Sequence, residues 1–368
     1  MIGVYISFPF CAQKCSYCNF ASGVFSRELR KRYTRALKKE LLAAKYPSAP
    51  ETLYIGGGTP SLLEPEELET ILSALPQREW REATMEAAPG TLTPERVRGW
   101  KRLGINRVSL GVQSFVPEVA RAAGRRHTPE VVCEEIGLLR AEGIVRFNVD
   151  LIAGLARQSE ASWREDFTWA ERVEAKHVSV YMLEVDDESR LGAELREGGS
   201  RYGAETVPDD DRIASFYEEA VETLRAHGVE RYEISNFAAP GEESAHNLKY
   251  WSLRPYLGFG ADAHSFDGRR RWGNVSSPAE YADRIEAGQS IRVDEETVEG
   301  ARKLEDFLLT GLRRREGLLL SAARRAALAE PLARLGQRGW LRVSAAGRVR
   351  LTDDGILFSN EVFGELTA

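Results

Sequence analysis

Long uncharged hydrophobic runs are absent from this sequence of 368 residues. A membrane-spanning helix needs about 20 predominantly apolar residues in succession, so the sequence predicts no integral membrane segment. Residues 1–10 also lack the basic start and the small-residue cleavage site of a secretory signal peptide. We therefore expect a cytoplasmic protein.

Lysine is scarce as well, with nine residues among the 50 basic ones, so arginine carries most of the positive charge. The formal net charge is nevertheless -6 at pH 7. Nucleic-acid-binding proteins usually have a basic patch or stripe, and this balance predicts no nucleic-acid partner. Because arginine is common throughout the chain, we interpret the arginine runs at 269–271 and 313–315 as solvated faces rather than binding patches.

Cysteine is rare, yet three of the four cysteines lie close together in the stretch PFCAQKCSYCNF (residues 9–20). In a cytoplasmic protein, clustered cysteines are more often metal ligands or catalytic groups than disulfide partners. Cys11, Cys15 and Cys18 could hold three irons of a four-iron cluster, whose fourth iron would stay open to a small molecule. A zinc site completed by a distant histidine is the alternative. The remaining Cys133 is interpreted as core packing.

Strand-like and helix-like stretches alternate over the first two-thirds of the chain. The predicted strands are 3–8, 52–55, 83–87, 107–112, 145–152 and 177–183. The predicted helices are 26–45, one that begins at Pro65, 94–103, 116–123, 129–142, 159–172 and 209–227. Such alternation predicts an α/β fold with a parallel sheet, and this many units indicate a full or partial barrel. Residues 192–211, rich in glycine and acidic residues, are predicted to form a mobile loop.

The pattern changes after about residue 250. Helices are predicted at 295–316 and 320–335, then short strands at 339–343 and 348–352 and a last helix at 354–366. This order indicates a small α+β module that resembles a winged helix, and the acidic balance favours a packing or lid role for it over DNA binding. We expect a first domain over residues 1–250 and a second over residues 251–368.

Glycines and polar residues fall at the carboxyl ends of successive predicted strands, where barrel proteins carry their active sites. The stretch GGGTP (56–60) ends the second strand, Glu86 the third, Gln113 the fourth and Asp150 the fifth. Glycine lets the backbone approach a ligand closely, although three glycines alone also suit a tight turn. The two carboxylates could bind hydroxyl or ammonium groups.

The spacing CxxxCxxC directly after a first short strand resembles the signature of the radical S-adenosylmethionine (SAM) superfamily. The resemblance implies a partial (β/α) barrel and a 4Fe-4S cluster on Cys11, Cys15 and Cys18, with SAM on the open iron. In that superfamily an electron from the cluster releases a 5'-deoxyadenosyl radical from SAM. The positions that match SAM contacts in related oxidases are Tyr5, Gly57, Gly58, Thr59, Glu86, Gln113, Arg125 and Asp150.

Longer stretches narrow the resemblance to the oxygen-independent coproporphyrinogen III oxidases and the related HemW-type haem chaperones. They are YIGGGTPSLL, RVSLGVQSF, GRRHTPE, VDLIAGL, RYEISNFA, HNLKYW, GFGADAHSF and LTDDGILFSNEVF. True oxidases have a further cysteine where this chain has Phe20, and an extension before the first strand. Both differences favour the chaperones. So does HNLKYW, a stretch whose histidine is implicated in haem binding, so the resemblance implies His246 as a haem ligand. The other histidines are interpreted as structural, and His264 is the second candidate ligand because it ends another glycine-rich, strand-like run.

Three short motifs depart from the pattern of that group. The group's HIP is Ser7-Phe8-Pro9 here, its ENP is represented by residues 86–89 with alanine for asparagine, and its GLPGQT is GLARQS at 154–159. These changes bear on the geometry of SAM binding and leave the cysteine and glycine motifs intact.

The resemblance implies a chaperone that binds haem and passes it to apo-proteins such as respiratory enzymes, with the cluster and SAM in an assembly or regulatory role. The alternative is an oxygen-independent coproporphyrinogen III oxidase of porphyrin biosynthesis, in which the radical drives oxidative decarboxylation of two propionates to give protoporphyrinogen IX. Whether SAM is cleaved, and therefore whether the protein is an enzyme, is left open. Peripheral contact with a membrane and a homodimer are left open too.

Overall fold

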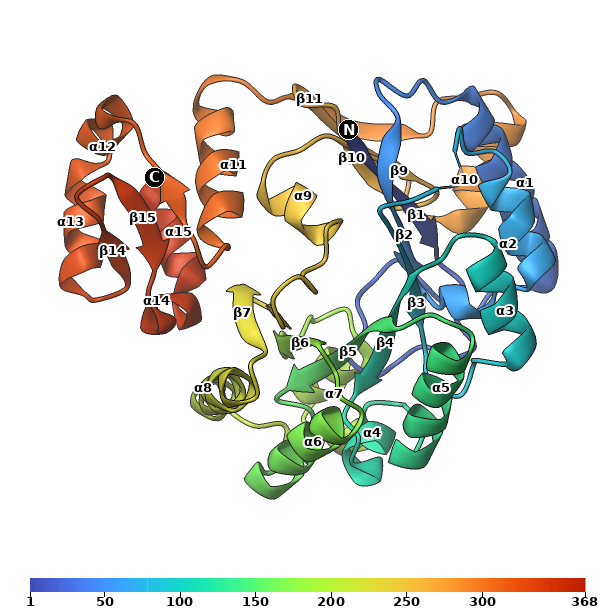
Figure 1. Cartoon of the computed structure of the whole chain (residues 1–368), viewed down its shortest axis with the longest axis horizontal. Coiled ribbons are helices and arrows are strands. Elements are labelled where there is room, and N and C mark those ends of the chain that lie inside the picture. Colours follow the sequence, from blue (N-terminus) through green and yellow to red (C-terminus); the bar gives the residue numbers. More distant parts are fainter. Residues whose placement is uncertain (78, 368) are drawn as a thin grey trace.

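The structure is a computed structural model that describes residues 1–77 and 79–367 (Figure 1). The strands of its large sheet are β1 (Ile2–Phe8), β2 (Pro50–Gly57), β3 (Glu82–Ala87), β4 (Arg107–Gln113), β5 (Arg146–Ala153), β6 (His177–Met182), β7 (Glu230–Glu233), β8 (Asn236–Ala238), β9 (Tyr256–Phe259), β10 (His264–Phe266), β11 (Arg270–Asn274) and β12 (Arg292–Thr297). The helices that accompany it are α1 (Arg27–Ala43), α2 (Pro65–Leu72), α3 (Pro94–Arg102), α4 (Pro117–Ala122), α5 (Pro129–Ala141), α6 (Glu160–Arg172), α7 (Arg190–Arg196), α8 (Asp210–Ala226), α9 (Asn247–Trp251) and α10 (Pro278–Glu286).

A smaller module follows. It consists of α11 (Gly300–Leu312), β13 (Leu318–Leu319), α12 (Ala322–Ala327), α13 (Ala329–Gln337), β14 (Leu341–Val343), β15 (Arg348–Leu351), α14 (Asp353–Leu357) and α15 (Ser359–Thr367). Its three strands form a separate sheet in the order β13-β15-β14. Figure 1 shows this module as a red and orange unit beside the large sheet.

The large sheet is a partial barrel built around parallel strands. Its order is β12-β11-β10-β9-β1-β2-β3-β4-β5-β6-β8-β7, with β12 and β7 as the outer strands. The run from β9 through β1 to β6 is parallel, and the pairs beyond it on both sides are antiparallel. The α/β prediction and the first six predicted strands are confirmed, with ends that differ by one or two residues.

Helix signals in the sequence explain the first helices. The Ser26 side chain accepts a hydrogen bond from the Leu29 amide (3.1 Å) and so caps α1. Proline at the first position and an acidic first turn begin α2, whose capping box is formed by Glu64 and Glu67. Thr93 caps α3 in the same way as Ser26 caps α1.

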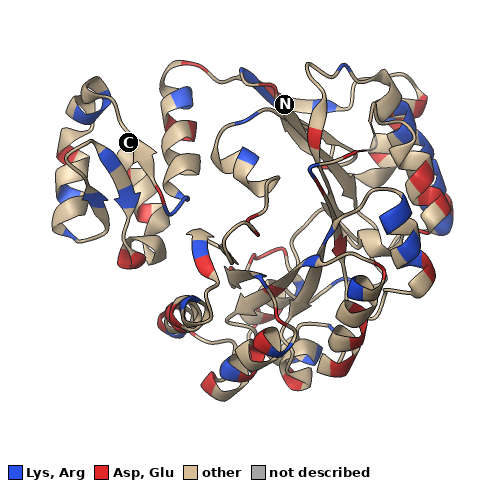
Figure 2. Ribbon diagram, viewed as in Figure 1, with Lys and Arg blue, Asp and Glu red and all other residues tan. Residues whose placement is uncertain are grey.

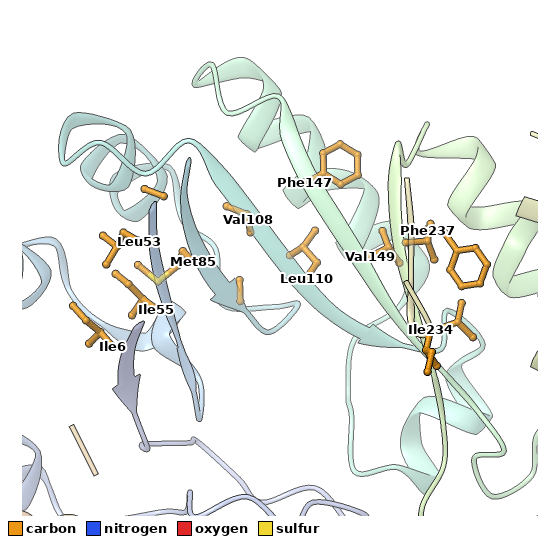
Figure 3. Close-up of a cluster of buried hydrophobic side chains, with 14 of the residues drawn as sticks. Ile6, Leu53, Ile55, Met85, Val108, Leu110, Phe147, Val149, Ile234 and Phe237 are labelled. Carbon is orange, nitrogen blue, oxygen red and sulfur yellow. The ribbon is translucent and has the colours of Figure 1, made fainter. Parts of the chain in front are cut away.

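The parallel strands have one apolar and one polar face, because successive side chains of a strand point to opposite sides. The apolar face packs against the surrounding helices, and Figure 3 labels part of it: Ile6, Leu53, Ile55, Met85, Val108, Leu110, Phe147 and Val149. The alternate positions on the inner side carry Tyr5, Tyr54 and Glu86. Burial of each large aliphatic side chain stabilises the fold by roughly 1.5–3 kcal/mol, which holds the polar inner face in place.

Four secondary-structure predictions need correction. The helices predicted at 320–335 and 354–366 are each divided in two, into α12 and α13 at Leu328 and into α14 and α15 at Phe358. Residues 192–211 are not simply a loop, since they contain the end of α7 and a short 3-10 helix at Arg201–Thr206, with Gly192 and Ala204 buried. The helix predicted at 295–316 begins only at Gly300, because β12 pairs with β11 up to Thr297.

The small module joins the outer strand β7 through the segment that follows α11. The Arg315 amide donates to the Tyr232 carbonyl (3.0 Å), and Arg314 forms a bridge with Glu233. Arg313 lies 3.4 Å from the Glu233 carboxylate, and Arg271 lies 2.6 Å from Asp306 of α11. Glu233 is fully buried.

The arginine runs are therefore not merely solvated faces. That interpretation is wrong for Arg271 and Arg313, whose acidic partners are buried. Elsewhere, Figure 2 shows basic and acidic residues interspersed along the outer helices. Because β9–β12 extend the large sheet well beyond residue 250, we propose that the boundary between the two domains lies near residue 300. Within the described part of the chain, no helix is both long and apolar enough to cross a membrane.

Candidate functional site

The cysteine stretch forms a loop between β1 and α1 that is closed by its own backbone. The Cys11 amide donates to the Gly23 carbonyl (2.8 Å), and the Gly23 amide donates to the Pro9 carbonyl (2.9 Å). The middle of the loop is tied to the end of α4, where the Ser16 hydroxyl donates to the Ala122 carbonyl (3.1 Å). These bonds fix the loop at the carboxyl end of β1.

The three thiols of this loop suit a cluster that takes thiolate ligands. Cys11, Cys15 and Cys18 are free and half-buried. Burial raises the pKa of Cys11, and its hydrogen bonds with Thr59 and Ser22 act in the opposite direction. In a 4Fe-4S cluster each cysteine binds a different iron through its thiolate. Among the described residues no three His, Cys, Asp or Glu side chains gather around a position for one metal ion.

The glycine turn after β2 holds the backbone against the cysteine loop. The Gly58 amide donates to the Phe8 carbonyl (2.9 Å), and the Thr59 amide donates to the Phe10 carbonyl (3.0 Å). A Cβ atom on Gly58 would lie 2.8 Å from the Phe10 nitrogen, and Gly57 has a φ of 105°. Both positions therefore require glycine, and the turn brings main-chain groups up to the cluster loop.

Two carboxylates lie beside this turn. Glu86 accepts hydrogen bonds from the Tyr54 hydroxyl (3.0 Å) and the Gly57 amide (3.2 Å). Burial, reinforced by the nearby Asp150, raises the pKa of Glu86 to about 7. Asp150 accepts from Ser109 (3.1 Å), and burial raises its pKa too. A ligand with cationic or hydroxyl groups would bind these two carboxyl groups and offset the free-energy cost of their burial.

Two buried polar atoms at the same end of the sheet lack partners among the described residues. Gln113 closes β4 in the left-handed region, with a φ of 68°, and its Oε1 has no hydrogen bond. Arg125 Nε has none either, while its Nη2 donates to the Tyr17 hydroxyl in the cysteine loop (3.4 Å). Buried polar groups are nearly always paired, so these two atoms point to a ligand.

The structure thus gathers the predicted SAM contacts at one place. Tyr5 stacks on Tyr54 with ring centroids 6.1 Å apart, and its pKa is raised by burial and by Glu86. Together with the turn, the two carboxylates and the two unpartnered atoms, it lies along the inner face of β1–β5 toward their carboxyl ends and on the loop after α4. The set is Tyr5, Gly57, Gly58, Thr59, Glu86, Gln113, Arg125 and Asp150.

His246 lies toward the amino ends of β1 and β2, one side chain from that set: its ring centroid is 5.4 Å from that of Tyr54, whose hydroxyl donates to Glu86. The His246 ring is fully buried, with Nδ1 2.9 Å from the Thr52 hydroxyl and Nε2 2.8 Å from the Tyr250 hydroxyl. Burial, with a contribution from Lys249, lowers the pKa of His246 to about 3. Haem ligation by His246 stays a prediction, and it would require one of these two hydrogen bonds to break.

Sequence reasoning missed Glu82, which anchors the segment around His246. Glu82 is fully buried at the start of β3 and accepts hydrogen bonds from the Ser244 hydroxyl (3.1 Å) and from the amides of Ala245 (3.0 Å) and His246 (2.9 Å). Arg107 lies 3.6 Å from the same carboxylate. The available signal was an acidic residue at the start of a strand that is buried over most of its length.

The motif departures have local structural counterparts. Arg157 occupies the position of the second glycine of GLPGQT and has a φ of 66°, a conformation that glycine adopts more easily. The neighbouring Gln158 holds the turn by accepting from the Gly154 amide (2.6 Å). Ser7, in place of the histidine of HIP, accepts a hydrogen bond at its carbonyl from Tyr33 (2.8 Å).

Comparisons with known proteins agree with this geometry. The radical SAM superfamily matches residues 5–170. A protein named heme chaperone HemW from Bacillus subtilis is 32% identical over 385 residues, covering 99% of this chain and 98% of its own. The heme chaperone HemW of Mycobacterium tuberculosis is 37% identical over 349 residues, covering 91% of this chain and 84% of its own.

Among solved structures, coproporphyrinogen III oxidase (HemN) from Escherichia coli, a radical SAM enzyme, has the same fold. Its TM-score is 0.86 at 20% identity, covering 100% of this chain and 90% of that one. The chain belongs to the radical SAM superfamily and, within it, to the HemW family.

Proposed function

We propose that this protein is a haem chaperone that binds haem and passes it to acceptor apo-proteins such as respiratory enzymes in the cytoplasm. The observation that carries the proposal is the similarity to HemW proteins, which extends over 99% of the chain. The exposed Phe20, where oxidases have a further cysteine, supports the same assignment. Contact with a membrane surface and a homodimer are compatible with this role.

We further propose that Cys11, Cys15 and Cys18 hold a 4Fe-4S cluster and that SAM binds beside it. When bound, the cluster supplies one electron at a time and an open iron. The main chain at Gly57 and Gly58 would bind the amino group of SAM. Arg125, with its unpartnered Nε, would pair with the SAM carboxylate. Glu86 and Asp150 would accept hydrogen bonds from the ribose hydroxyls.

The second candidate is an oxygen-independent coproporphyrinogen III oxidase. The observation that favours it is that the eight predicted SAM contacts lie together along the inner face of β1–β5, toward their carboxyl ends, and on the loop after α4. This arrangement is compatible with radical chemistry as well as with a regulatory use of SAM.

A transfer assay separates the two functions. The protein, with its cluster reconstituted anaerobically, is loaded with haem and mixed with an apo-protein that takes b-type haem. We expect the acceptor's spectrum to appear faster than with the same concentration of free haem. The same preparation is given coproporphyrinogen III, SAM and a reductant. Formation of protoporphyrinogen IX without haem transfer would overturn the chaperone proposal in favour of the oxidase.

A further inference from the structure

A network of buried polar side chains leads away from Asp150 in the proposed SAM site. Asn148, two positions earlier on β5, is buried, and its amide nitrogen lies within hydrogen-bond distance of three oxygens. They belong to Asp150 (2.6 Å), Ser109 (2.8 Å) and Ser179 (3.0 Å). Because an amide nitrogen carries two hydrogens, the three acceptors compete for them. The bonds of Asn148 therefore depend on what else Asp150 binds.

The first branch of this network runs through Ser179 to the outer strands of the large sheet. The Ser179 hydroxyl donates to Asn236 Oδ1 on β8 (2.8 Å), and the Asn236 amide nitrogen donates to the buried carboxylate of Glu233. Glu233 pairs in turn with Arg313 of the small module at 3.4 Å. Since the Ser179 hydrogen is used on Asn236, the Ser179 oxygen is left to accept from Asn148. Each member of the branch is thus oriented by the one before it.

The second branch runs through His177. Burial holds the pKa of His177 well below its ordinary value, so the ring is neutral. Its Nδ1 lies 2.5 Å from Asn148 Oδ1, which can only accept, so Nδ1 carries the hydrogen and the amide orientation is fixed. Nε2 then accepts from the Tyr232 hydroxyl (2.9 Å), and the Tyr232 carbonyl accepts from the Arg315 amide (3.0 Å). Both branches therefore end on residues 313–315.

Residues 313–315 hold the small module on β7, which faces the module in Figure 1. The ion pair between Arg315 and Glu230 is half exposed, and exposed pairs contribute little to stability. The pair between Arg313 and Glu233 is different, because the Glu233 side chain is fully buried. The network therefore reaches the ionic contact on which docking of the module depends most. Parts of one chain held by polar contacts can move relative to each other.

We infer that SAM binding at Asp150 and docking of the small module on β7 stabilise each other, and that Asn148 is the positioning residue that connects them. The inference rests on the proposed SAM site and adds a form of regulation to it. A ligand hydroxyl that donates to Asp150 satisfies that carboxylate, so the Asn148 amide donates more strongly to Ser179. Ser179 then holds the first branch, and with it the Glu233 carboxylate, in place for the module. By linkage, firm docking favours the same arrangement around Asp150.

Hydrogen exchange of the cluster-containing protein tests the inference. Exchange in the segment that contains residues 313–315 is followed by mass spectrometry, with and without saturating SAM. We expect SAM to slow this exchange about fivefold in wild type, the lower end of typical coupling between two sites. The double variant Ser179→Ala, Tyr232→Phe interrupts both branches. Once calorimetry has shown that SAM saturates this variant, SAM should leave its exchange at 313–315 unchanged.

A matched control separates the network from a general disturbance of β7. Tyr217→Phe also removes a buried tyrosine hydroxyl, one that donates to the Ile234 carbonyl (2.5 Å) next to Glu233 but does not bond to the network. Its exchange should respond to SAM as wild type does. A structural role of the two hydroxyls alone would lower stability in all these variants without removing the response to SAM.

The reciprocal measurement is the calorimetric affinity for SAM. Arg313→Ala, which lies in the small module, should bind SAM about fivefold more weakly than wild type, because coupling between two sites is mutual. Arg314→Ala removes an exposed pair with Glu316 and should bind SAM like wild type. Unchanged exchange of wild type at saturating SAM, or equal slowing in wild type and the double variant, would overturn the inference and leave the SAM site in place. A wild type that binds no SAM would overturn the SAM proposal and the inference together.

Discussion

The guanidinium of Arg313 lies 4.4 Å from the ring centroid of Trp251, and its Nη2 lies 3.4 Å from the carboxylate of Glu233. One side chain of the small module thus contacts both the end of α9 and the outer strand β7. Glu233 is fully buried and also accepts a hydrogen bond from the Ser235 amide (3.1 Å). Removal of Arg313 would leave that carboxylate without its cation.

We therefore expect Arg313→Ala to lower the free energy of unfolding by about 1–3 kcal/mol, since a buried charge-assisted bond and a cation–π contact are lost. Arg313→Lys keeps the charge without the planar stacking group and should cost less. Denaturant unfolding followed by tryptophan fluorescence measures both. As a control, Arg314→Ala removes a pair with the exposed Glu316 and should cost under about 0.5 kcal/mol. Similar losses for Arg313→Ala and Arg314→Ala would contradict the role assigned to Arg313.

Gln113 combines a left-handed backbone with an unpartnered buried amide oxygen. Gln113→Gly relieves the backbone strain and should stabilise the ligand-free protein by about 0.5–1 kcal/mol. It also removes an amide aimed at the proposed SAM site, so we expect at least a fivefold loss of SAM affinity in calorimetry. A gain in stability together with a loss of SAM affinity would show that the backbone strain at Gln113 is kept because its side chain serves ligand binding.

Arg157 provides the matched control because its φ of 66° is close to the 68° of Gln113. Arg157→Gly should give a similar stability gain and a smaller change in SAM affinity than Gln113→Gly, since its side chain pairs with Glu118 in an exposed position. If both variants lose SAM affinity equally, the loss comes from the backbone and not from the Gln113 amide.

Glu86 gives the folded protein a defined pH dependence. Its pKa is raised from 4.5 to about 7, first by burial and then by Asp150. The folded state therefore holds the proton more tightly than the unfolded state, and this contribution to stability is lost as the pH rises from about 4.5 to about 7. At pH 8 the ionised carboxyl destabilises the fold by up to about 3 kcal/mol.

Glu86→Gln removes this penalty while keeping groups that can bond Tyr54 and the Gly57 amide. We expect the variant to be more stable than wild type at pH 8 and to differ less from it at pH 5. Thermal unfolding of the SAM-free protein at the two pH values measures the difference. A stability difference that does not change with pH would be evidence against a protonated Glu86.

The cysteines allow a direct test of the cluster ligands. Cys11→Ala, Cys15→Ala and Cys18→Ala should each abolish the visible absorbance of the reconstituted cluster and lower the bound iron. Cys133→Ala is the matched control. Cys133 is half-buried in α5, packs against the core and lies outside the loop, so its variant should keep wild-type iron content. Loss of iron in Cys133→Ala would instead indicate that Cys133 is a fourth cluster ligand, which would leave no iron open to SAM.

The parallel strands could be predicted from sequence because each is an apolar run followed by a helix with its own start signal. The short strands β7–β10 were missed for a physical reason: β8 and β10 have three residues each and β7 and β9 four, and pairing with neighbouring strands in the tertiary fold stabilises them. The environment of His246 depends likewise on Glu82, which is 164 positions away in the chain. Local patterns contain no trace of that contact.

The candidate site divides in the same way. The spacing of the cysteines and glycines by itself indicates a cluster and a ligand-binding turn, so those residues could be identified without coordinates. Gln113 was also found from the sequence, but its left-handed conformation could not be predicted, because it follows from the irregular pairing of β4 with β5 between Leu110 and Gln113. The exposed His264 lies opposite Gly273, a neighbour that only the strand register reveals.

The two outer strands of the large sheet are protected from association in different ways. An unpaired strand edge is a template for pairing with another chain, and it invites aggregation. The small module covers β7, because the Arg315 amide bonds the Tyr232 carbonyl there. In contrast, no described strand or loop pairs with the outer edge of β12, which has the sequence RVDEET with most of its residues exposed. The mixed charges of β12 discourage edge-to-edge pairing. The edge of β7 depends instead on the small module, and loss of that module would expose it.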